Sequence, residues 1–366
     1  MAQFKKIIHV VGARPNYMKI APVYRALEAA GGVEQILVHT GQHYSPEMST
    51  HFFDELGMPR PDVNLNVGSG SHAEQTGRIM QAFEPVLLEH KPDLVIVVGD
   101  VNSTIACALD AKKLDIAVAH VESGLRSFDM RMPEEVNRVL TDRISDFLFT
   151  TEASGNKNLA AEGYDDGLVH FVGNVMIDSL VTHLEKARQR DVLQRLGHTD
   201  GGYVLVTIHR PSNVDEEPVL AQLVETLILA SERRPLLVPL HPRTRNNLER
   251  FGLFERLAGV AAVTICEPLG YLDFLRCQAG AAAILTDSGG IQEESTYLGV
   301  PCITMRENTE RPATITDGTN RLIGTDQGEI LEALDAALAR NRGDHPVPPL
   351  WDGKAAERIA AILLAV

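Results

Sequence analysis

Short apolar segments alternate with longer amphipathic ones along almost the whole chain. The apolar segments are rich in Val, Ile and Leu and do not alternate with polar residues, which is typical of strands buried on both faces of a parallel sheet. They lie at residues 7–11, 36–40, 94–100, 116–122, 147–151, 169–173, 203–209, 236–241, 262–268, 281–287 and 301–306. Helical patterns such as APVYRALEAAG and PEEVNRVLTDRIS separate them. This alternation predicts an α/β protein.

A long polar stretch divides the predicted strands into two groups. Residues 174–202 contain HLEKARQRDVLQRLGHTDGG, which predicts a helix and a loop. Two doubly wound, Rossmann-like sheets of about five or six strands suit this length better than one large sheet. We therefore expect an N-terminal domain over 1–173, a C-terminal domain over 174–352, and a final helix over 353–366 that packs back on the first domain. Ligands of such sheets bind beyond the carboxyl ends of the strands, so a cleft between the domains is the expected site.

Composition narrows the class of protein. The net charge is −15, which disfavours binding to nucleic-acid backbones, and no apolar run approaches the roughly 20 residues that cross a bilayer. The N-terminus MAQFKKIIHVVG enters a predicted strand directly and does not resemble a signal peptide. None of the four cysteines forms a C-x-x-C pair, so neither a zinc site nor a redox pair is indicated. We expect a cytoplasmic protein that binds neither nucleic acid nor membranes.

Two cations follow the first predicted strand. In VVGARPNYMKIAPV, Gly12 ends the strand, and Arg14 and Lys19 lie near the start of the next helix. Backbone N–H groups at a helix start also favour an anion. The motif is neither G-x-G-x-x-G nor a Walker P-loop, so a dinucleotide or ATP is not predicted by those routes. An ordinary turn with two solvated cations is the alternative to an anion or substrate site.

Two acids end neighbouring predicted strands. Asp100 ends the strand in VVGDVNST, and Glu122 ends the strand in AHVESGLR, with His120 and Arg126 close by. Both carboxylates should point into one crevice, where like charges raise each other's pKa. A carboxyl group of that kind can transfer protons near neutral pH.

A second pair of acids lies at the start of another predicted helix. In RMPEEVNR, Pro133 suits the first helical turn, and Glu134 and Glu135 follow it. Acids at a helix N-terminus are often plain partners of the helix dipole, and Glu135 could be no more than that.

Two histidines end strands of the second group. His209 in LVTIHRPSNVD and His241 in LVPLHPRTRNNL each have an arginine nearby. A structural, hydrogen-bonded histidine is the alternative to a contact with phosphate or substrate.

The segment ILTDSGGIQEES predicts a nucleotide site. Asp287 and Ser288 should cap a helix that begins with Gly289 and Gly290, where a ligand can approach the backbone and the N–H groups suit a phosphate. Either Glu293 or Glu294 could then bind the hydroxyls of a ribose. A well-capped helix with exposed acids is the alternative.

Taken together, these motifs resemble the non-hydrolysing bacterial UDP-N-acetylglucosamine 2-epimerases over nearly the whole chain. The resemblance rests on GARPNYMKIAP, TGQH, GDVNST, HVESGLR, PEEVNR, VGNVMID, HRPSNVD, HPRTR, LTDSGGIQEES and RENTERPATITDGTNRLIG. It implies the glycosyltransferase-B fold, with two Rossmann-like domains and the active site between them. It also implies interconversion of UDP-GlcNAc and UDP-ManNAc without metal or other cofactor, in polysaccharide biosynthesis, by a homodimer.

The resemblance assigns roles to individual residues. It implies catalytic roles for Asp100, Glu122, Glu134 and His209, and a second, regulatory UDP-GlcNAc site near Gln42 and His43. The substrate-binding residues that we expect are Arg14, Lys19, His241, Ser288, Gly289, Gly290 and Glu294.

Two departures from the family pattern affect the substrate and the regulation. Ser45 stands where a longer polar residue is expected near the regulatory site. ARPNYMK replaces the TRPEAIK of many members, which leaves the substituents at C3 and C6 of the sugar open.

Three alternative functions share parts of this pattern. A glycosyltransferase of the same fold would share the Ser-Gly-Gly site, but the acids of the first domain distinguish an epimerase. A hydrolysing epimerase would release ManNAc and UDP, and an inactive nucleotide-sugar-binding regulator would not need the acids and the histidine. No D-x-D occurs in the chain, which disfavours a metal-bridged diphosphate.

Overall fold

A computed structural model describes residues 4–41, 57, 59–340 and 345–366. Contacts divide the chain into two compact units. Unit 1 comprises residues 1–182 and 349–366, and unit 2 comprises residues 183–348. The domain boundary predicted after residue 173 lies before the helix α7 (Val175–Arg188), whereas the division between the units falls within this helix.

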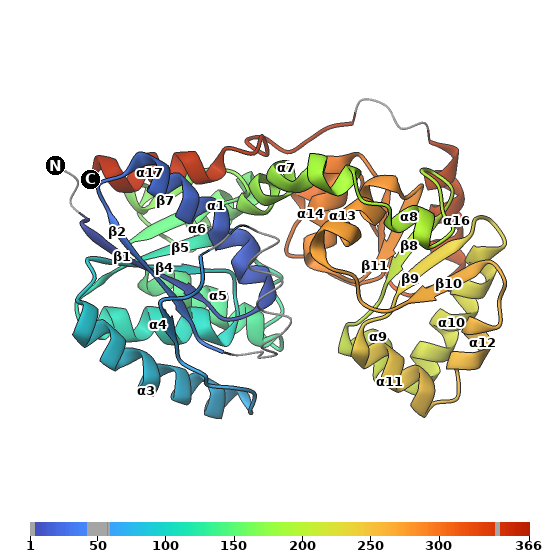
Figure 1. The fold of residues 1–366 in the computed structure, drawn as a ribbon, viewed down its shortest axis with the longest axis horizontal. Helices are drawn as coiled ribbons and strands as arrows, with labels where there is room; N and C mark the ends of the chain where they lie inside the picture. Colours follow the sequence, from blue (N-terminus) through green and yellow to red (C-terminus); the bar gives the residue numbers. More distant parts are fainter. Residues whose placement is uncertain (1–3, 42–56, 58, 341–344) are drawn as a thin grey trace. The chain divides into compact units, whose positions relative to one another are not determined.

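Unit 1 is built on a seven-stranded parallel sheet in the order β3-β2-β1-β4-β5-β6-β7. Its strands are β1 (Lys6–Val11), β2 (Glu34–His39), β3 (Val63–Asn64), β4 (Leu94–Val98), β5 (Ala117–Ser123), β6 (Phe147–Thr150) and β7 (Val169–Phe171). Its helices are α1 (Arg14–Ala30), α3 (His72–His90), α4 (Asn102–Lys113), α5 (Pro133–Ile144), α6 (Ala153–Ala161), the 3₁₀ turn Asp166–Leu168, the first part of α7, and α17 (Ala355–Ala365). Figure 1 shows α1 and α17 on one face of this sheet and α3 and α4 on the other.

Unit 2 is built on a six-stranded parallel sheet in the order β10-β9-β8-β11-β12-β13. Its strands are β8 (Val204–Thr207), β9 (Leu236–Pro239), β10 (Val263–Cys266), β11 (Ala283–Thr286), β12 (Cys302–Thr304) and β13 (Asn320–Leu322). Its helices are α8 (Val192–Arg195), α9 (Pro211–Val214), α10 (Glu217–Ser231), α11 (Pro242–Arg250), α12 (Phe254–Ala258), α13 (Tyr271–Gly280), α14 (Gly289–Leu298), α15 (Ala313–Thr316) and α16 (Gln327–Ala339). The fold class predicted from the sequence, two doubly wound α/β sheets, is confirmed.

The strands lack polar alternation because both of their faces are covered. In β8, Val204 and Val206 pack with α10 and α16, while Leu205 packs on the other face with residues of α13 and α14. All three side chains are completely buried. The sequence analysis missed β3 and β13, which lie at sheet edges and are two and three residues long.

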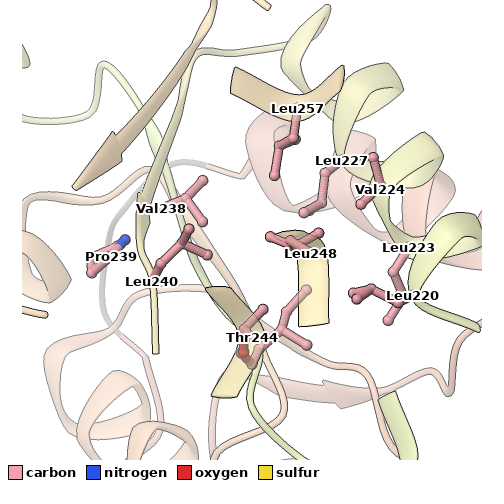
Figure 2. Close-up of a pocket in the computed structure, with 11 residues that line it drawn as sticks. Leu220, Leu223, Val224, Leu227, Val238, Pro239, Leu240, Thr244, Leu248 and Leu257 are labelled. Carbon is pink, nitrogen blue, oxygen red and sulfur yellow. The ribbon is translucent and has the colours of Figure 1, made fainter. Parts of the chain in front are cut away.

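An apolar cavity of about 20 Å³ lies in unit 2 between β9, α10 and α11 (Figure 2). Apart from Thr244, whose hydroxyl donates to the Ile208 carbonyl, its walls are hydrophobic. A space of this size and polarity is a packing gap in the core and offers a ligand no polar partners to fix its orientation.

Each sheet has one point at which the strand order reverses. In unit 1 the reversal lies between β1 and β4, and in unit 2 it lies between β8 and β11. Loops that leave two such neighbouring strands diverge to opposite faces of the sheet, so a crevice opens at their carboxyl ends. The candidate residues after β1, β4, β8 and β11 therefore lie where this fold binds ligands.

Candidate functional site

The turn after β1 holds Lys19 inside unit 1. Asn16 fixes the turn, because its side chain accepts a hydrogen bond from the Ala13 N–H at 2.9 Å and donates to the Val98 carbonyl at 3.0 Å. Lys19 follows on α1, is 8% exposed, and forms an ion pair with Glu122 of β5. Arg14 is the first residue of α1, and its side chain lies outside the described part of the structure.

Glu122 has an unusual backbone conformation. Its φ of 72° lies in the left-handed region, and the pairing of β5 with β6 shifts register between Val121 and Ser123. Such a conformation in a residue other than glycine costs on the order of 1–3 kcal/mol and often marks a functional site. Neighbouring Gly99 leaves room for the pair, since a Cβ there would lie 3.2 Å from Lys19 Nζ and 3.4 Å from Glu122 Oε2.

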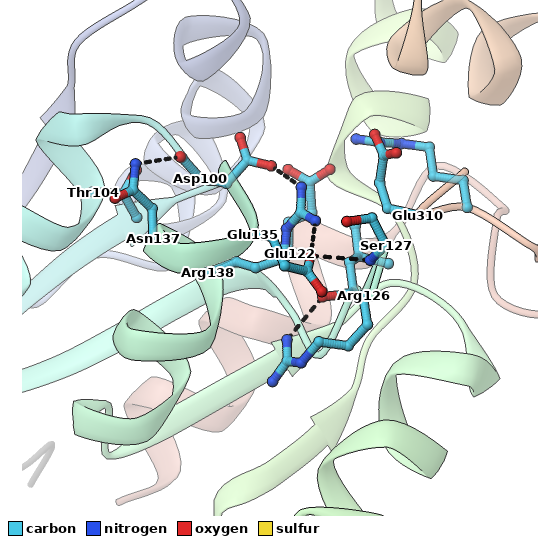
Figure 3. Close-up of polar contacts among 12 residues, drawn as sticks. Asp100, Thr104, Glu122, Arg126, Ser127, Glu135, Asn137, Arg138 and Glu310 are labelled. Carbon is cyan, nitrogen blue, oxygen red and sulfur yellow. Dashed lines mark hydrogen bonds and ion pairs between the residues drawn. The ribbon is translucent and has the colours of Figure 1, made fainter. Parts of the chain in front are cut away.

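Asp100 follows β4, beside Glu122 on the neighbouring strand β5. Arg138 of α5 forms an ion pair with the Asp100 carboxylate, and Asn137 donates to the Asp100 backbone carbonyl at 2.9 Å (Figure 3). The Asp100 side chain is 29% exposed, so it remains accessible to solvent or a ligand.

The two adjacent glutamates of α5 have different environments. Glu134 is half-buried and precedes Asn137 and Arg138 by three and four residues, so the three share one side of the helix, which faces Asp100. Glu135 is 1% exposed and accepts the N–H groups of Ser127 at 3.0 Å and Phe128 at 2.8 Å. Glu135 thus anchors the loop before α5, in addition to any effect on the helix dipole.

In unit 2, Asp287 joins the ends of β8 and β11. Its carboxylate accepts the backbone N–H groups of His209 and Arg210 and the side-chain amide of Asn213. His209 Nδ1 lies 2.9 Å from Asp287 Oδ1, and the His209 side chain is 36% exposed. Burial by itself would raise the pKa of Asp287, but the hydrogen bond and charge of His209 lower it below its usual value. Asp287 therefore orients His209 and leaves its ring accessible.

His241 lies next to His209, with 5.3 Å between the ring centroids. It is the N-cap of α11, where its Nδ1 accepts the Arg243 N–H at 3.2 Å. Burial and the neighbouring His209 lower the pKa of His241. One ring nitrogen thus has a structural role, and Nε2 is the nitrogen that a ligand could contact.

The start of α14 can accept an anion. Ser288 is the N-cap residue, and Gly289 and Gly290 form the first turn. A Cβ on Gly289 would lie 2.9 Å from Arg311 Nη1, whereas a Cβ on Gly290 would meet nothing within 4 Å. The first-turn N–H groups of a helix lack intrahelical partners and favour a phosphate. Arg311 and its ion-pair partner Glu310 both lie beside them.

Two buried arginines and two buried glutamates form an ion-pair network beside the start of α14. Arg311 pairs with Glu293 and Glu310, and Arg306 pairs with Glu310 at 3.0 Å. Burial lowers the pKa of Arg306, against the attraction of Glu310, and the nearby Arg210 and Arg311 lower it further.

Glu293 and Glu294 have separate partners on α14. Glu293 pairs with Arg311 at 3.0 Å, whereas Glu294 accepts from Gln278 at 2.5 Å and lies 3.4 Å from the Tyr271 hydroxyl. Glu294 thus contacts an amide and a hydroxyl, whereas Glu293 contacts a cation, and a carboxylate can accept hydrogen bonds from hydroxyl groups such as those of a ribose.

Comparison with known proteins identifies the family. The family model described as UDP-N-acetylglucosamine 2-epimerase matches residues 25–364. The chain belongs to the UDP-N-acetylglucosamine 2-epimerase family. It is similar to the UDP-N-acetylglucosamine 2-epimerase of Methanocaldococcus jannaschii, with 43% identity and 98% of each chain covered. The crystal structure of the M. jannaschii epimerase in complex with UDP-GlcNAc and UDP matches with a TM-score of 0.91 and covers 99% of this chain and 100% of that one.

A relative with another substrate in its name is almost as similar. The UDP-2,3-diacetamido-2,3-dideoxy-D-glucuronate 2-epimerase of Pseudomonas aeruginosa is 40% identical, and the match covers 98% of this chain and 99% of that protein. The prediction of a non-hydrolysing UDP-GlcNAc 2-epimerase, an isomerase with the glycosyltransferase-B fold, is confirmed by the family and the structural match.

The two acids of unit 1 each have a cation as partner, Lys19 for Glu122 and Arg138 for Asp100, and their effect on each other's pKa stays a prediction. One detail of the predicted nucleotide site is wrong. Ser288 occupies the N-cap position of α14 without a side-chain capping bond, since Asp287 is used to hold the His209 loop.

Some residues near the predicted site have structural roles in the epimerase. His120 is completely buried, with Nδ1 2.6 Å from Asp142 and Nε2 2.8 Å from the Gly99 carbonyl. Arg126 pairs with Asp142 and Glu162. Gln42, His43 and Ser45 lie outside the described residues.

Sequence reasoning missed Arg138, Glu135 and Arg311 as parts of the site. The motifs PEEVNR and RENTER contain them. Glu135 was noted only for its place at a helix start, and nothing in the sequence alone distinguished Arg138 and Arg311 from other charged residues. Arg138 in particular meets Asp100 across 38 residues of chain.

Proposed function

We propose that this epimerase interconverts UDP-GlcNAc and UDP-ManNAc by elimination and re-addition of UDP. One carboxylate removes the proton at C2 while the bond between C1 and the UDP oxygen breaks, which gives 2-acetamidoglucal and UDP. A different acid then delivers a proton to the other face of C2, and the UDP oxygen adds back to C1. Atoms and charge balance without an oxidant or reductant.

The proposal assigns the proton transfers to unit 1. Asp100, Glu122 and Glu134 are its proton carriers, because inversion at one carbon requires groups on both faces. The observation that carries this assignment is the pair of carboxylates at the ends of β4 and β5, each next to a buried cation. Lys19 and Arg14 would also stabilise negative charge on the departing UDP.

The nucleotide is assigned to unit 2. Ser288, Gly289 and Gly290 would bind the diphosphate through the start of α14, and Glu294 would bind the ribose hydroxyls. His209, oriented by Asp287, would contact the reacting part of the substrate, and His241 would assist in binding. A cleft between the two predicted domains, a homodimer and a cytoplasmic location stay predictions. Among the described residues, no helix is both long and apolar enough to span a membrane.

Incubation with UDP-GlcNAc in heavy water, followed by proton NMR, tests the reaction. We expect UDP-ManNAc with deuterium at C2. Product that retains protium at C2 would contradict elimination and re-addition, and accumulation of free ManNAc and UDP would indicate a hydrolysing enzyme. Conversion of the C3- and C6-modified sugar nucleotide, but not of UDP-GlcNAc, would place this chain with its P. aeruginosa relative.

The variant Glu122→Gln tests the role of a single carboxylate. It keeps the size of the side chain but cannot accept a proton at neutral pH, so we expect turnover to fall by roughly 10²–10⁴-fold. UDP should still bind through unit 2. The matched control is Glu162→Gln, which makes the same change at a partner of Arg126 and should retain turnover. Near-normal turnover of Glu122→Gln would remove Glu122 from the mechanism.

A further inference from the structure

Arg138 connects two carboxylates inside unit 1. Its side chain is 3% exposed, and its two terminal nitrogens bind different carboxylates. Nη2 pairs with Asp100 Oδ2, and Nη1 pairs with Glu135 Oε2 (Figure 3). A guanidinium group is planar and its donors have fixed directions, so a carboxylate paired with it is restrained in orientation as well as in position.

Glu135 is itself fixed in place. Its two oxygens accept the backbone N–H groups of Ser127 and Phe128, and its side chain is 2% exposed. Glu135 therefore cannot move without loss of these bonds, and the buried N–H group of Ser127 would be left without a partner at a cost of about 1–3 kcal/mol. Glu135 therefore holds Arg138 at Nη1, the nitrogen that does not bind Asp100.

The backbone of Asp100 is restrained separately. The adjacent residue of α5, Asn137, donates to its carbonyl at 2.9 Å. The main chain is thus held by Asn137, while Arg138 acts on the carboxylate. Because 29% of the Asp100 side chain is exposed, packing alone does not fix its orientation.

We propose that Arg138 is a positioning residue for Asp100 in the epimerase reaction and that Glu135 holds Arg138 in place. Of the two adjacent glutamates of α5, the first would then serve the substrate and the second would act through Arg138. The proposal rests on the proposed role of Asp100. Its physical basis is that displacement of a reacting group by about 1 Å can cost on the order of 10²-fold in rate.

The variant Arg138→Lys tests the proposal by steady-state kinetics with UDP-GlcNAc. Lysine keeps the charge but cannot contact Asp100 and Glu135 with two directed nitrogens, so kcat should fall about 10- to 100-fold. KM and the affinity for UDP should stay within about twofold, because the nucleotide is assigned to unit 2. Unchanged kcat would overturn the proposal. A raised KM and a lower affinity for UDP at normal kcat would also overturn it, because they would indicate a direct contact between Arg138 and the substrate.

Arg126→Lys is the matched control. Arg126 is also buried in unit 1 and also joins two carboxylates, Asp142 at 2.7 Å and Glu162 at 2.7 Å, but it does not contact a proposed proton carrier. We expect both variants to lower the melting temperature and only Arg138→Lys to lower the kcat of the folded protein. An equal loss of kcat in the two variants would assign Arg138 a purely structural role.

Glu135→Gln provides a second variant if Arg138→Lys fails to fold. Glutamine keeps an oxygen for the loop N–H groups but loses the charge that holds Arg138. We expect kcat to fall with KM unchanged, by less than in Arg138→Lys. Normal kcat in folded Glu135→Gln would remove Glu135 from the proposal. Normal kcat in both Glu135→Gln and Arg138→Lys would contradict the whole proposal.

The background Asp100→Asn separates positioning from other roles. If Arg138 acts through Asp100, then Arg138→Lys should reduce kcat no further once Asp100 is replaced, because the effects of residues acting as a unit are not additive. If the double variant instead loses kcat by the product of the two single losses, the proposal is contradicted. Near-normal activity of Asp100→Asn alone would instead overturn the proposed role of Asp100, so the two failures can be distinguished.

Discussion

The pair of Lys19 and Glu122 explains why a strained residue can persist at the end of β5. A left-handed conformation is unfavourable for glutamate, yet it coincides with a buried ion pair to Lys19 and with the register shift beside it. Breaking a buried ion pair by removal of one partner typically costs about 3–5 kcal/mol, which exceeds the strain. The surrounding structure thus stabilises a conformation that the residue alone would avoid.

Phe128 has a similar backbone conformation, but its side chain lacks comparable stabilising contacts. Its φ is 58°, and 77% of the residue is exposed, so little packing compensates for the strain. Asparagine tolerates this conformation better than other residues with a Cβ. We expect Phe128→Asn to raise the free energy of unfolding in urea by about 0.5–1 kcal/mol. Phe128→Leu, which keeps the strain, should give no gain, and equal stability of the two variants would contradict the explanation.

Residue types at strand ends were predictable, but their partners were not. Asp100 and Glu122 follow apolar runs, and this position alone predicted that they lie together at one edge of the sheet. That Arg138 would meet Asp100 depends on how α5 packs against the sheet, which local pattern does not encode. The same limit explains why the sequence left open whether Glu135 is more than a partner of the helix dipole.

At the scale of elements, the start of α14 is a test of the nucleotide site. Gly290 has open space where a Cβ would lie, so a side chain can be accommodated. Gly290→Asp would add negative charge where the diphosphate is predicted, and UDP affinity measured by calorimetry should fall about tenfold or more. Gly290→Asn is the control of equal size, with a smaller expected loss. Unchanged affinity in folded Gly290→Asp would argue against this placement.

The attachment of α17 to α7 should depend on pH. Asp178 of α7 accepts the N–H groups of Ala355 at 3.1 Å and Ala356 at 2.7 Å at the start of α17. Burial raises the pKa of Asp178 from 3.8 to about 6, although these two hydrogen bonds oppose the shift. The folded protein then binds this proton more tightly than the unfolded chain does. The contribution of Asp178 to stability is therefore present below about pH 4 and is lost as the pH rises to about 6.

The variant Asp178→Asn measures this contribution. We expect the free energy of unfolding of the wild type to decrease relative to the variant by up to about 3 kcal/mol between pH 4 and pH 6, and the difference to stay constant above that range. Asp352→Asn is the control on the same segment, because Arg358 lowers the pKa of Asp352. Parallel stability curves for the wild type and Asp178→Asn would show that Asp178 does not titrate in this range.

Elements buried on both faces were the most predictable part of the fold. Each of the eleven predicted strands overlaps a strand of the structure, since continuous apolar runs are required where helices cover both faces. The edge strands β3 and β13 were missed because a few residues at an edge need no such run. The prediction of a capping bond at the start of α14 was wrong for a different reason. Asp287 binds the loop after β8 instead, and such a tertiary contact cannot be read from the local sequence.

At the scale of the whole molecule, two sheets with one reversal point each organise the candidate residues. The proposed proton carriers Asp100 and Glu122 lie at the ends of β4 and β5 in unit 1, while His209 and the start of α14 follow β8 and β11 in unit 2. Two separate reversal points suit a substrate with two chemically distinct parts, a nucleotide and a sugar. The placement of these residues in different sheets was predictable from the order of motifs along the chain, because the acids and the Ser-Gly-Gly motif fall in different groups of strands.

The buried cations in both units predict that catalysis needs no added metal ion. In sites that bind a diphosphate leaving group, a divalent cation often neutralises the developing charge. Here buried cations adjoin both parts of the proposed site, namely Lys19 beside Glu122, Arg138 beside Asp100, and Arg311 beside Gly289. Glu122 and Asp100 are engaged by Lys19 and Arg138, so a metal ion would have to compete with these cations. We expect kcat and KM for UDP-GlcNAc to be unchanged in excess EDTA. Added Mg²⁺ or Mn²⁺ should not accelerate a sample dialysed against EDTA, and loss of activity that either ion restores would show that the charge is neutralised by a metal instead.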